Sequence, residues 1–496
     1  METWRLLLNG FAIALQPQNL LSTFAGVLVG QVIGALPGIG PALGMVLLLP
    51  ISFGLEPVTA IVMLAGIMYG AMYGGTITSV LINIPGESAS VMTTVEGRHL
   101  ARQGKAGAAL SIAAVGSFIA GAGSILALIV AAVGISQFAL RFSAPEYFLL
   151  AAIGILATAS LATGSMVKAL IVAVFGLMLA LVGVDPILGS SRLTFGSAGL
   201  LDGIDFMPVA IGVFGIAEVL VSLEQPVTAL PRRMRMREMW PKWSDWKACR
   251  MAIARGGTIG FLLGLLPGVG PTASTFIAYA AERRFSKHPE KFGKGALDAV
   301  ASVESANNSA VTGSLVPMLT LGIPGSGMTA VLLAALTLHG IKPGPLLMTE
   351  QPEVVWGLIA SMFVGNAILL VLNLPLAPVF ALLLRVPYAF LAPAILLMSV
   401  IGAYATTLDM FVVGLTLVFG LIGYLMIKLE LPRAPLILAL VLAPIMESSL
   451  RQSLILSQGS LGIFVQRPMA ACLLAVFTAL LIGPMLAKVL RRRPAH

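Results

Sequence analysis

The chain has 496 residues and a formal net charge of +9. Hydrophobic residues make up 58% of it and charged residues only 10%, with a mean hydropathy of +0.98. Soluble domains carry about 25% charged residues, so this composition excludes an ordinary soluble protein and predicts an all-α polytopic membrane protein. The positive charge gathers at residues 232–250 and 488–493, beside apolar segments. Such clusters mark cytoplasmic loops rather than a nucleic-acid-binding surface.

Residues of common enzyme and metal sites do not cluster along the sequence. Cys249 and Cys472 are too few and too far apart for a disulfide framework or a metal site. The histidines are widely spaced and no phosphate-binding loop is present, which argues against a zinc site, a serine triad and ATP hydrolysis. These histidines are His99, His288, His339 and His496. We therefore expect a protein without cofactor or transition metal that is not an enzyme.

The first apolar segment is interrupted at residues 34–41 by Gly-Ala-Leu-Pro-Gly-Ile-Gly-Pro. Proline removes a backbone donor and glycine permits unusual backbone shapes, so a helix cannot continue through this stretch. In lipid, a broken backbone persists only where it is buried in protein or lines a watery cavity. We expect a hairpin tip here, with the helix after Pro41 directing free N–H groups at an anion. The alternative is a kink packed through small residues.

A predicted crossing at 57–83 ends in the sequence Asn-Ile-Pro-Gly-Glu-Ser-Ala-Ser at 83–90. Its hydroxyl and amide side chains suit hydrogen bonding to a polyoxygenated substrate. The alternative is that Ser88, like Ser326 after the later copy of this turn, only caps the next short helix. Glu87 would repel a carboxylate, so a cation site or a structural role is favoured for it.

Both interruptions recur in the same order. The motif Leu-Pro-Gly-x-Gly-Pro returns at 266–271, 230 residues later, and Ile-Pro-Gly returns at 323–325, 239 residues later. A recurrence of two motifs in order predicts an internal duplication. Loop charges reverse between the copies: Glu56 follows the first break, whereas basic residues such as Lys287 follow the second. The two repeats should therefore lie inverted in the membrane.

The basic loops on either side of 251–281 leave too few residues for two crossings at about 20 each, so this segment is predicted to be a re-entrant hairpin. Its twin should enter from the opposite side. With 57–83, the chain is predicted to make about eleven crossings plus two hairpins. The other crossings are predicted at 106–133, 147–163, 166–184, 206–223, 296–322, 354–384, 388–408, 411–427, 434–447 and 468–487. The predicted divisions are residues 1–224 (first membrane repeat), 225–250 (basic cytoplasmic linker) and 251–496 (second repeat with C-terminal spans).

The crossing at 296–322 contains an unusual polar stripe. Glu304, Asn308 and Thr312 recur every four residues, on one helical face. Carboxylates and amides at membrane depth usually face a cavity, an ion or a partner group, and these oxygen ligands suit a hard cation such as Na⁺. The alternative is interhelical hydrogen bonding.

Two sets of candidate site residues follow. The substrate-binding candidates are Pro37, Gly38, Gly40, Asn83, Ser88, Ser90, Gly268, Gly270, Thr272, Ser326 and Thr329. The cation-binding candidates are Thr76, Glu304, Asn307, Asn308 and Thr312.

These motifs, from Gly34–Pro41 and Asn83–Ser88 to Gly264–Pro271, Glu304–Asn308 and Gly322–Gly327, resemble the large membrane subunit of tripartite tricarboxylate transporters. The resemblance covers nearly the whole chain. It implies a permease of the bacterial inner membrane that works with a small four-span membrane subunit and a periplasmic solute-binding protein. It also implies cation-coupled uptake of citrate or a related carboxylate.

The sequence thus predicts a secondary transporter that imports a di- or tricarboxylate with Na⁺ or H⁺ as the coupling ion. An intramembrane enzyme would need a nucleophile–base or carboxylate–metal constellation, and none is visible. A receptor or scaffold subunit without transport would need neither duplicated broken helices nor a buried polar stripe.

Overall fold

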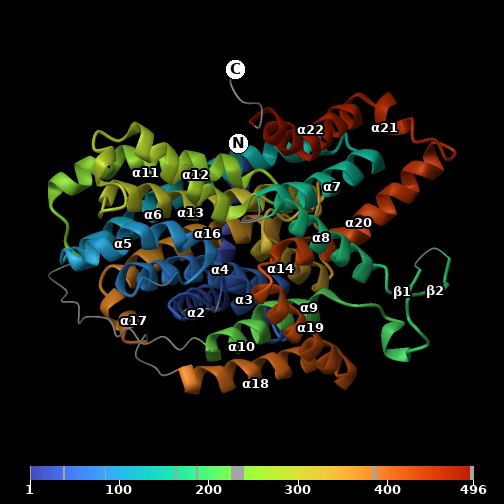
Figure 1. The fold of residues 1–496 in the computed structure, drawn as a ribbon, viewed down its shortest axis with the longest axis horizontal. Helices are drawn as coiled ribbons and strands as arrows, with labels where there is room; N and C mark the ends of the chain where they lie inside the picture. Colours follow the sequence, from blue (N-terminus) through green and yellow to red (C-terminus); the bar gives the residue numbers. More distant parts are fainter. Residues whose placement is uncertain are drawn as a thin grey trace.

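The computed structural model describes residues 2–36, 40–83, 85–161, 165–185, 188–224, 239–383 and 388–491. In these residues the fold is helical apart from one antiparallel pair, β1 (Gly183–Val184) with β2 (Ser191–Arg192). The predicted fold class, an all-α membrane protein, is therefore confirmed in the described residues. Figure 1 shows the β1–β2 pair at one end of the molecule and α18 along its lower edge.

The first part of the chain is built around two breaks. Helices α2, α3 and α4 each begin at a proline, whose missing N–H costs nothing in a first turn. The helix α1 and its neighbour α2 meet at a bend of 78°. The elements are α1 (Glu2–Ala14), α2 (Pro17–Gly34), α3 (Pro41–Ser52), α4 (Pro57–Leu81), η1 (Ser88–Ser90), α5 (Val91–Arg102) and α6 (Ala106–Ala139).

A middle group of helices connects this part to the second pair of breaks. One span in it changes to a π-helical stretch, labelled η3, between two α-helical ends. The elements are α7 (Ala144–Leu161), α8 (Met166–Ala180), η2 (Ala198–Leu200), α9 (Phe206–Ala210), η3 (Ile211–Ile216) and α10 (Ala217–Glu224).

The second part repeats the order of the first and is followed by C-terminal helices. Its elements are α11 (Trp243–Gly264), α12 (Gly270–Phe285), η5 (Pro289–Lys291), α13 (Leu297–Leu321), α14 (Gly327–Leu338), α15 (Leu347–Glu350) and α16 (Pro352–Asn373). The last elements are α17 (Ala377–Leu383), α18 (Tyr388–Thr407), α19 (Met410–Lys428), α20 (Ala434–Leu456), α21 (Ile463–Gln466) and α22 (Pro468–Arg491).

Most predicted crossings coincide with a helix, but one prediction is wrong in its extent. The crossing predicted at 354–384 is two helices, because α16 ends at Asn373 and α17 begins after Pro375. Proline cannot continue the hydrogen-bond ladder, so it interrupts the apolar run there. Within the described residues, six helices are long and apolar enough to cross a membrane, or seven if the bent α1–α2 pair counts as one span. The figure of eleven crossings stays a prediction, as does the division into three segments.

Glycines let α2 and α11, the helices that end at the two breaks, contact the backbones of the longer helices α4 and α13. A β carbon on Gly30 of α2 would lie 2.3 Å from the Ile67 carbonyl oxygen of α4. A β carbon on Gly260 of α11 would lie 2.2 Å from the Ala306 carbonyl oxygen of α13. Real β carbons do not approach carbonyl oxygens this closely, so only glycine fits. This small-residue packing is the usual way for membrane helices to approach one another.

The two packing pairs correspond residue by residue. Gly26, Gly30 and Gly34 face the carbonyls of Met63, Ile67 and Ala71, while Gly256, Gly260 and Gly264 face those of Ser302, Ala306 and Ala310. The glycines differ by 230 positions and the carbonyls by 239, the same offsets that relate the two sequence motifs. Helices α2–α6 form the first unit, and helices α11–α16 form the second unit.

One buried carboxylate ties the two units together. Glu96 of α5 is fully buried and accepts backbone N–H bonds from Gly293 (2.5 Å), Gly295 (2.7 Å) and Ala296 (2.8 Å). The Tyr279 hydroxyl of α12 also donates to it at 2.7 Å. No side-chain cation is among these four donors. Glu96 thus fixes the loop that leads into α13.

The glycine contacts generate a stability prediction. Gly30→Ala and Gly260→Ala should each lower the thermal unfolding midpoint of the purified protein, because the new methyl group must push α2 from α4 or α11 from α13. The matched control is Gly414→Ala in α19, where an added β carbon meets nothing within 4 Å. That change should be neutral or stabilise the helix by up to about 1 kcal/mol. Equal midpoints for all three variants would show that the close helix contacts do not stabilise the fold.

Candidate functional site

The first hairpin tip presents an uncapped helix start. α2 ends at Gly34 and α3 starts at Pro41, with Gly40 as an extended N-cap residue (φ −65°, ψ 161°) and no side-chain cap. Among the described residues, nothing lies within 4 Å of a β carbon placed on Gly40, so this helix start has space beside it. The candidates Pro37 and Gly38 lie outside the described residues.

The second tip needs its glycines for two different reasons. Gly268 has φ +84°, and a β carbon there would lie 2.2 Å from Thr158 Oγ1 of α7. Gly270 has φ +62° but more space, since its nearest neighbour is Ser326 Cβ at 3.7 Å. α12 starts here, with Pro271 in its first turn and no side-chain cap. Both tips therefore offer helix starts whose N–H groups no side chain caps.

The two Ile-Pro-Gly turns lie against the tips. Gly268 donates its N–H to the Gly325 carbonyl at 3.2 Å, joining the second tip to the second turn. The hydroxyls of Ser88 and Thr272 are 2.8 Å apart, joining the first turn to the second tip. Close backbone packing joins the first turn to the end of α2, since a β carbon on Gly86 would lie 2.4 Å from the oxygen of Gly34. Broken segments from both units thus meet in one region.

Several hydroxyls proposed as substrate ligands cap helices. The Ser326 backbone N–H donates to Thr329 Oγ1 (2.8 Å), and the Thr329 N–H donates to Ser326 Oγ (3.3 Å), so this pair caps α14 as the alternative expected. Ser90 donates to the Glu87 carbonyl at 2.9 Å and is fully buried. Ser88 is exposed and meets Thr272 rather than capping α5. Asn83 is also exposed, with a left-handed φ of 58°.

Glu304 is the acidic residue among the cation-binding candidates, and only 1% of its surface is exposed. Thr76 of α4 donates to its Oε2 at 2.7 Å, and the Thr93 hydroxyl of α5 donates to Oε1. Ser117 of α6 donates to the Glu304 backbone carbonyl at 3.1 Å. A carboxylate from the second unit is therefore held by hydroxyls from the first.

Asn307 links this group to the first turn. Its Nδ2 donates to Glu87 Oε1 at 2.9 Å, while its Oδ1 is buried without a hydrogen-bond partner. A buried acceptor without a donor is costly, and an oxygen of this kind is what Na⁺ prefers as a ligand. Within the described residues, neither Glu87 nor Glu304 forms an ion pair with lysine or arginine.

The remaining two candidates of the stripe make different contacts. Asn308 Nδ2 donates to Ser117 Oγ at 2.8 Å and to the Glu304 carbonyl at 3.2 Å, so it stays next to Glu304. Thr312 donates to the Asn308 carbonyl at 3.3 Å, a bond within its own helix. The structure therefore brings Thr76, Glu304 and Asn308 into one bonded group, and Asn307 joins the adjacent Glu87.

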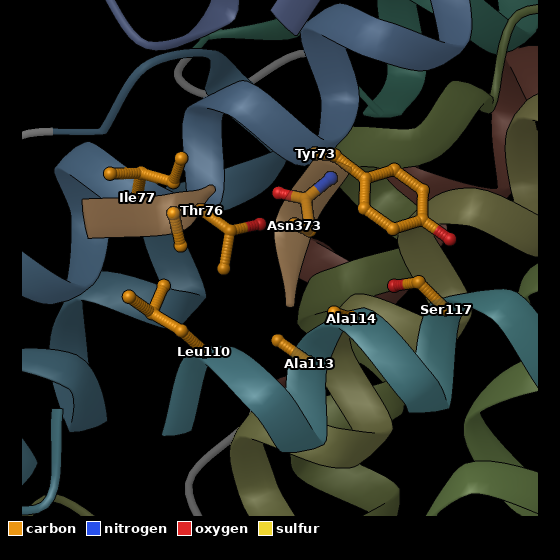
Figure 2. A pocket seen from close by; sticks show the side chains of 9 residues that line it. Tyr73, Thr76, Ile77, Leu110, Ala113, Ala114, Ser117 and Asn373 are labelled. Carbon is orange, nitrogen blue, oxygen red and sulfur yellow. The ribbon is translucent and has the colours of Figure 1, made fainter. Parts of the chain in front are cut away.

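A small cavity lies beside this group between α4, α6 and the end of α16. Its volume of about 10 Å³ fits roughly one water molecule. Figure 2 shows Thr76 and Tyr73 of α4 on one side, with Ala113, Ala114 and Ser117 of α6 on the other. Thr76 and Ser117, which line the cavity, both donate to Glu304. The space thus lies beside Thr76, whose hydroxyl donates to the Glu304 carboxylate, and Ser117, whose hydroxyl donates to the Glu304 backbone carbonyl.

Sequence reasoning missed Thr93 and Ser117 as partners of Glu304. Thr93 lies beside Thr94 in a polar stretch after the first Ile-Pro-Gly turn, and Ser117 is one of several serines in and near the crossing predicted at 106–133. Their only available signal in the sequence was a hydroxyl group, which they share with many serines and threonines that bond within their own helix.

Comparison with known proteins gives a family and close relatives. The family model described as "Tripartite tricarboxylate transporter TctA family" matches residues 20–438. An Agrobacterium vitis protein described as "Uncharacterized 52.8 kDa protein in TAR-I ttuC' 3'region" is 44% identical over 484 residues, covering 98% of this chain and 96% of that protein. A second A. vitis protein, "Uncharacterized protein in TAR-II ttuC' 3'region", is 42% identical over 234 residues, covering 47% of this chain and 97% of that protein. No solved structure matches this chain.

The contact between Ser88 and Thr272 generates a prediction about the convergence of the two units. In a variant without Cys249 and Cys472, the pair Ser88→Cys and Thr272→Cys should form an intramolecular disulfide under mild oxidation, because the two side chains are adjacent. Mass spectrometry of the linked peptides would identify the bond. Each single variant should give none, and a double variant that stays reduced would contradict the proximity of turn and tip.

Proposed function

The chain belongs to the tripartite tricarboxylate transporter TctA family, and we propose that it imports a di- or tricarboxylate together with a cation. The proposal rests on one observation above all. Two buried carboxylates, Glu304 and Glu87, adjoin the meeting point of the broken helices, and neither has a basic partner within the described residues.

Charge balance connects these carboxylates to a coupling ion. A buried, unpaired carboxylate is strongly disfavoured, so it takes up a proton or binds a cation. An anionic substrate arriving nearby adds further negative charge, which the same cation or proton offsets. Substrate and ion would therefore favour each other's binding, as cation-coupled uptake requires. We propose Na⁺ or H⁺ in this role, with Thr76, Glu304, Asn307 and Asn308 as the groups that respond to it.

Backbone N–H groups are proposed to hold the substrate. No lysine or arginine lies within residues 34–50 or 256–281, so side-chain cations do not supply local counter-charge at the tips. The uncapped starts of α3 and α12 supply donors and the positive ends of their helix dipoles. Ser88 and Thr272, which meet between the first turn and the second tip, are the side-chain candidates beside them.

The membrane arrangement is also part of the proposal. The matching glycine contacts of the two units support a duplication, and the reversed loop charges favour an inverted orientation. We propose an inner-membrane location and operation with a small four-span subunit and a periplasmic solute-binding protein. A receptor or scaffold role is the competing function, and it predicts binding without accumulation.

The coupling ion can be tested by uptake into proteoliposomes that contain the chain with its proposed partner subunits. Labelled citrate should accumulate when an inward Na⁺ or H⁺ gradient is imposed, and the active gradient identifies the ion. Asn307→Ala should raise the ion concentration for half-maximal uptake roughly five- to 150-fold, the equivalent of about 1–3 kcal/mol for one lost ligand. Thr312→Val should change it little, because the Thr312 hydroxyl bonds within its own helix. Identical ion dependence in both variants, at normal folding, would remove Asn307 from the site.

The anion-binding role of the first tip can be tested separately. Gly40→Val should fold normally, since φ at Gly40 is −65° and space surrounds it, yet its two methyl groups should block approach to the N–H groups of α3. Substrate affinity should therefore fall at least about tenfold, measured by equilibrium binding at saturating ion. Gly54→Val is the control, since an added β carbon there also has space, its nearest neighbour being Ile51 O at 3.9 Å. A folded Gly40→Val variant with unchanged affinity would place the carboxylates elsewhere.

A further inference from the structure

Three of the five tryptophans of the chain stand within seven residues, at Trp240, Trp243 and Trp246. Trp240 is 75% exposed and Trp243 is 81% exposed. In membrane proteins, exposed indole rings gather where the hydrocarbon meets the headgroups. Because α11 starts at Trp243, this segment marks the level at which the chain enters the hydrocarbon.

Two apolar hollows adjoin these rings, and residues from the N-terminal half of α6 line both of them. The larger has a volume of about 480 Å³ and lies between α6 and α11. It is lined by Val115, Ile119, Trp243, Trp246, Arg250, Ile253 and Ala254. The smaller has a volume of about 380 Å³ and lies between α6 and α16. It is lined by Ser111, Met239, Trp240, Leu370, Val371, Leu374 and Pro375.

Basic residues lie in the same short segment as the tryptophans that line the hollows. Along the chain, Lys242 lies between Trp240 of one hollow and Trp243 of the other. Among the described residues that line the hollows, Arg250 is the one that carries a charge. Lys242, Lys247 and Arg250 are all exposed. Asp245, the single acid between residues 239 and 250, accepts a bond from the backbone N–H of Lys242 at 3.0 Å. This patch therefore carries net positive charge at the membrane interface.

We propose that the two hollows and the basic patch bind one anionic phospholipid of the cytoplasmic leaflet. Its phosphate headgroup lies against Lys242 and Arg250, and its two acyl chains occupy the two hollows. The apolar linings suit acyl chains, and the lysine and arginine suit a negative headgroup. Exposed indole rings lie at the depth of the headgroup region, where the glycerol backbone of a lipid also lies. Among the described residues that line the hollows, none is a proposed carboxylate-binding or cation-binding residue.

The arrangement of the hollows favours a lipid over a helix of a partner protein. Among the described residues, the two hollows share no lining residue, and the segment 239–246 contributes to both. A diacyl lipid has one charged headgroup and two narrow chains, which matches two separate hollows with one basic patch. A docked helix is about 10–12 Å across with its side chains, and it needs a single continuous groove.

Quenching of tryptophan fluorescence by brominated lipids tests this site directly. The protein, with Trp4 replaced by phenylalanine, is placed in nanodiscs containing increasing fractions of phosphatidylglycerol brominated on its acyl chains. Half-maximal quenching should need several-fold less of this lipid than of brominated phosphatidylcholine. The double variant Lys242→Gln and Arg250→Gln should lose this preference, since each basic residue at a membrane surface contributes about five-fold in affinity for anionic lipid.

The control is Arg283→Gln with Arg284→Gln, which removes two exposed charges from the end of α12 at residues that are not among those lining either hollow. It should keep the preference for phosphatidylglycerol. Equal quenching by the two lipids in the parent protein, or equal loss in both double variants, would overturn the proposal. Displacement of the lipid by the purified small membrane subunit would also overturn it, in favour of a protein contact. Because the readout is binding rather than uptake, the result is independent of the proposed transport cycle.

Discussion

Backbone contact between a broken helix and a continuous helix is the constraint on which the rest of this structure depends. In both units, glycines on every fourth residue allow α2 to lie on α4 and α11 to lie on α13. The contact continues to Gly34 and Gly264, the last residues before each break. It therefore fixes where each tip begins relative to α4 or α13. The Ile-Pro-Gly turns that follow α4 and α13 are thereby held next to the tips.

The two units share this scaffold but not its polar groups. Gly66 and Gly70 of α4 face α2, whereas the equivalent positions of α13 are Ser305 and Ser309. In the second unit Ser309 instead donates to the Ala120 carbonyl of α6 at 3.1 Å. The two units thus produce one asymmetric polar group around Glu304 rather than two equivalent ones. Its donors Thr76 and Thr93 come from the first unit, so the group exists only when both units are packed together.

Local chemistry in the sequence predicts the breaks, the order of the repeats and the burial of the α13 stripe. Proline and glycine act on the backbone within a few residues, and the cost of burying Glu304 or Asn307 does not depend on which helix lies opposite. The partners of these residues depend on packing between distant segments, which no local pattern encodes. Thr93 and Ser117 were missed for this reason, and Thr312 satisfies its hydroxyl within its own helix despite its place in the stripe. The predicted crossing at 354–384 was too long. Its residues are apolar almost throughout, whereas Pro375 interrupts the helix between α16 and α17.

The binding of Glu96 shows how this protein already recognises a carboxylate without lysine or arginine. Three backbone N–H groups of a glycine-containing loop and one tyrosine hydroxyl surround the two oxygens. Main-chain donors belong to the fold and survive most amino-acid replacements. A transporter that holds its substrate in this manner keeps its affinity for carboxylates while the surrounding side chains diverge. Relatives built on the same backbone are then free to evolve toward acids of different size and shape without first acquiring a new anion-binding residue.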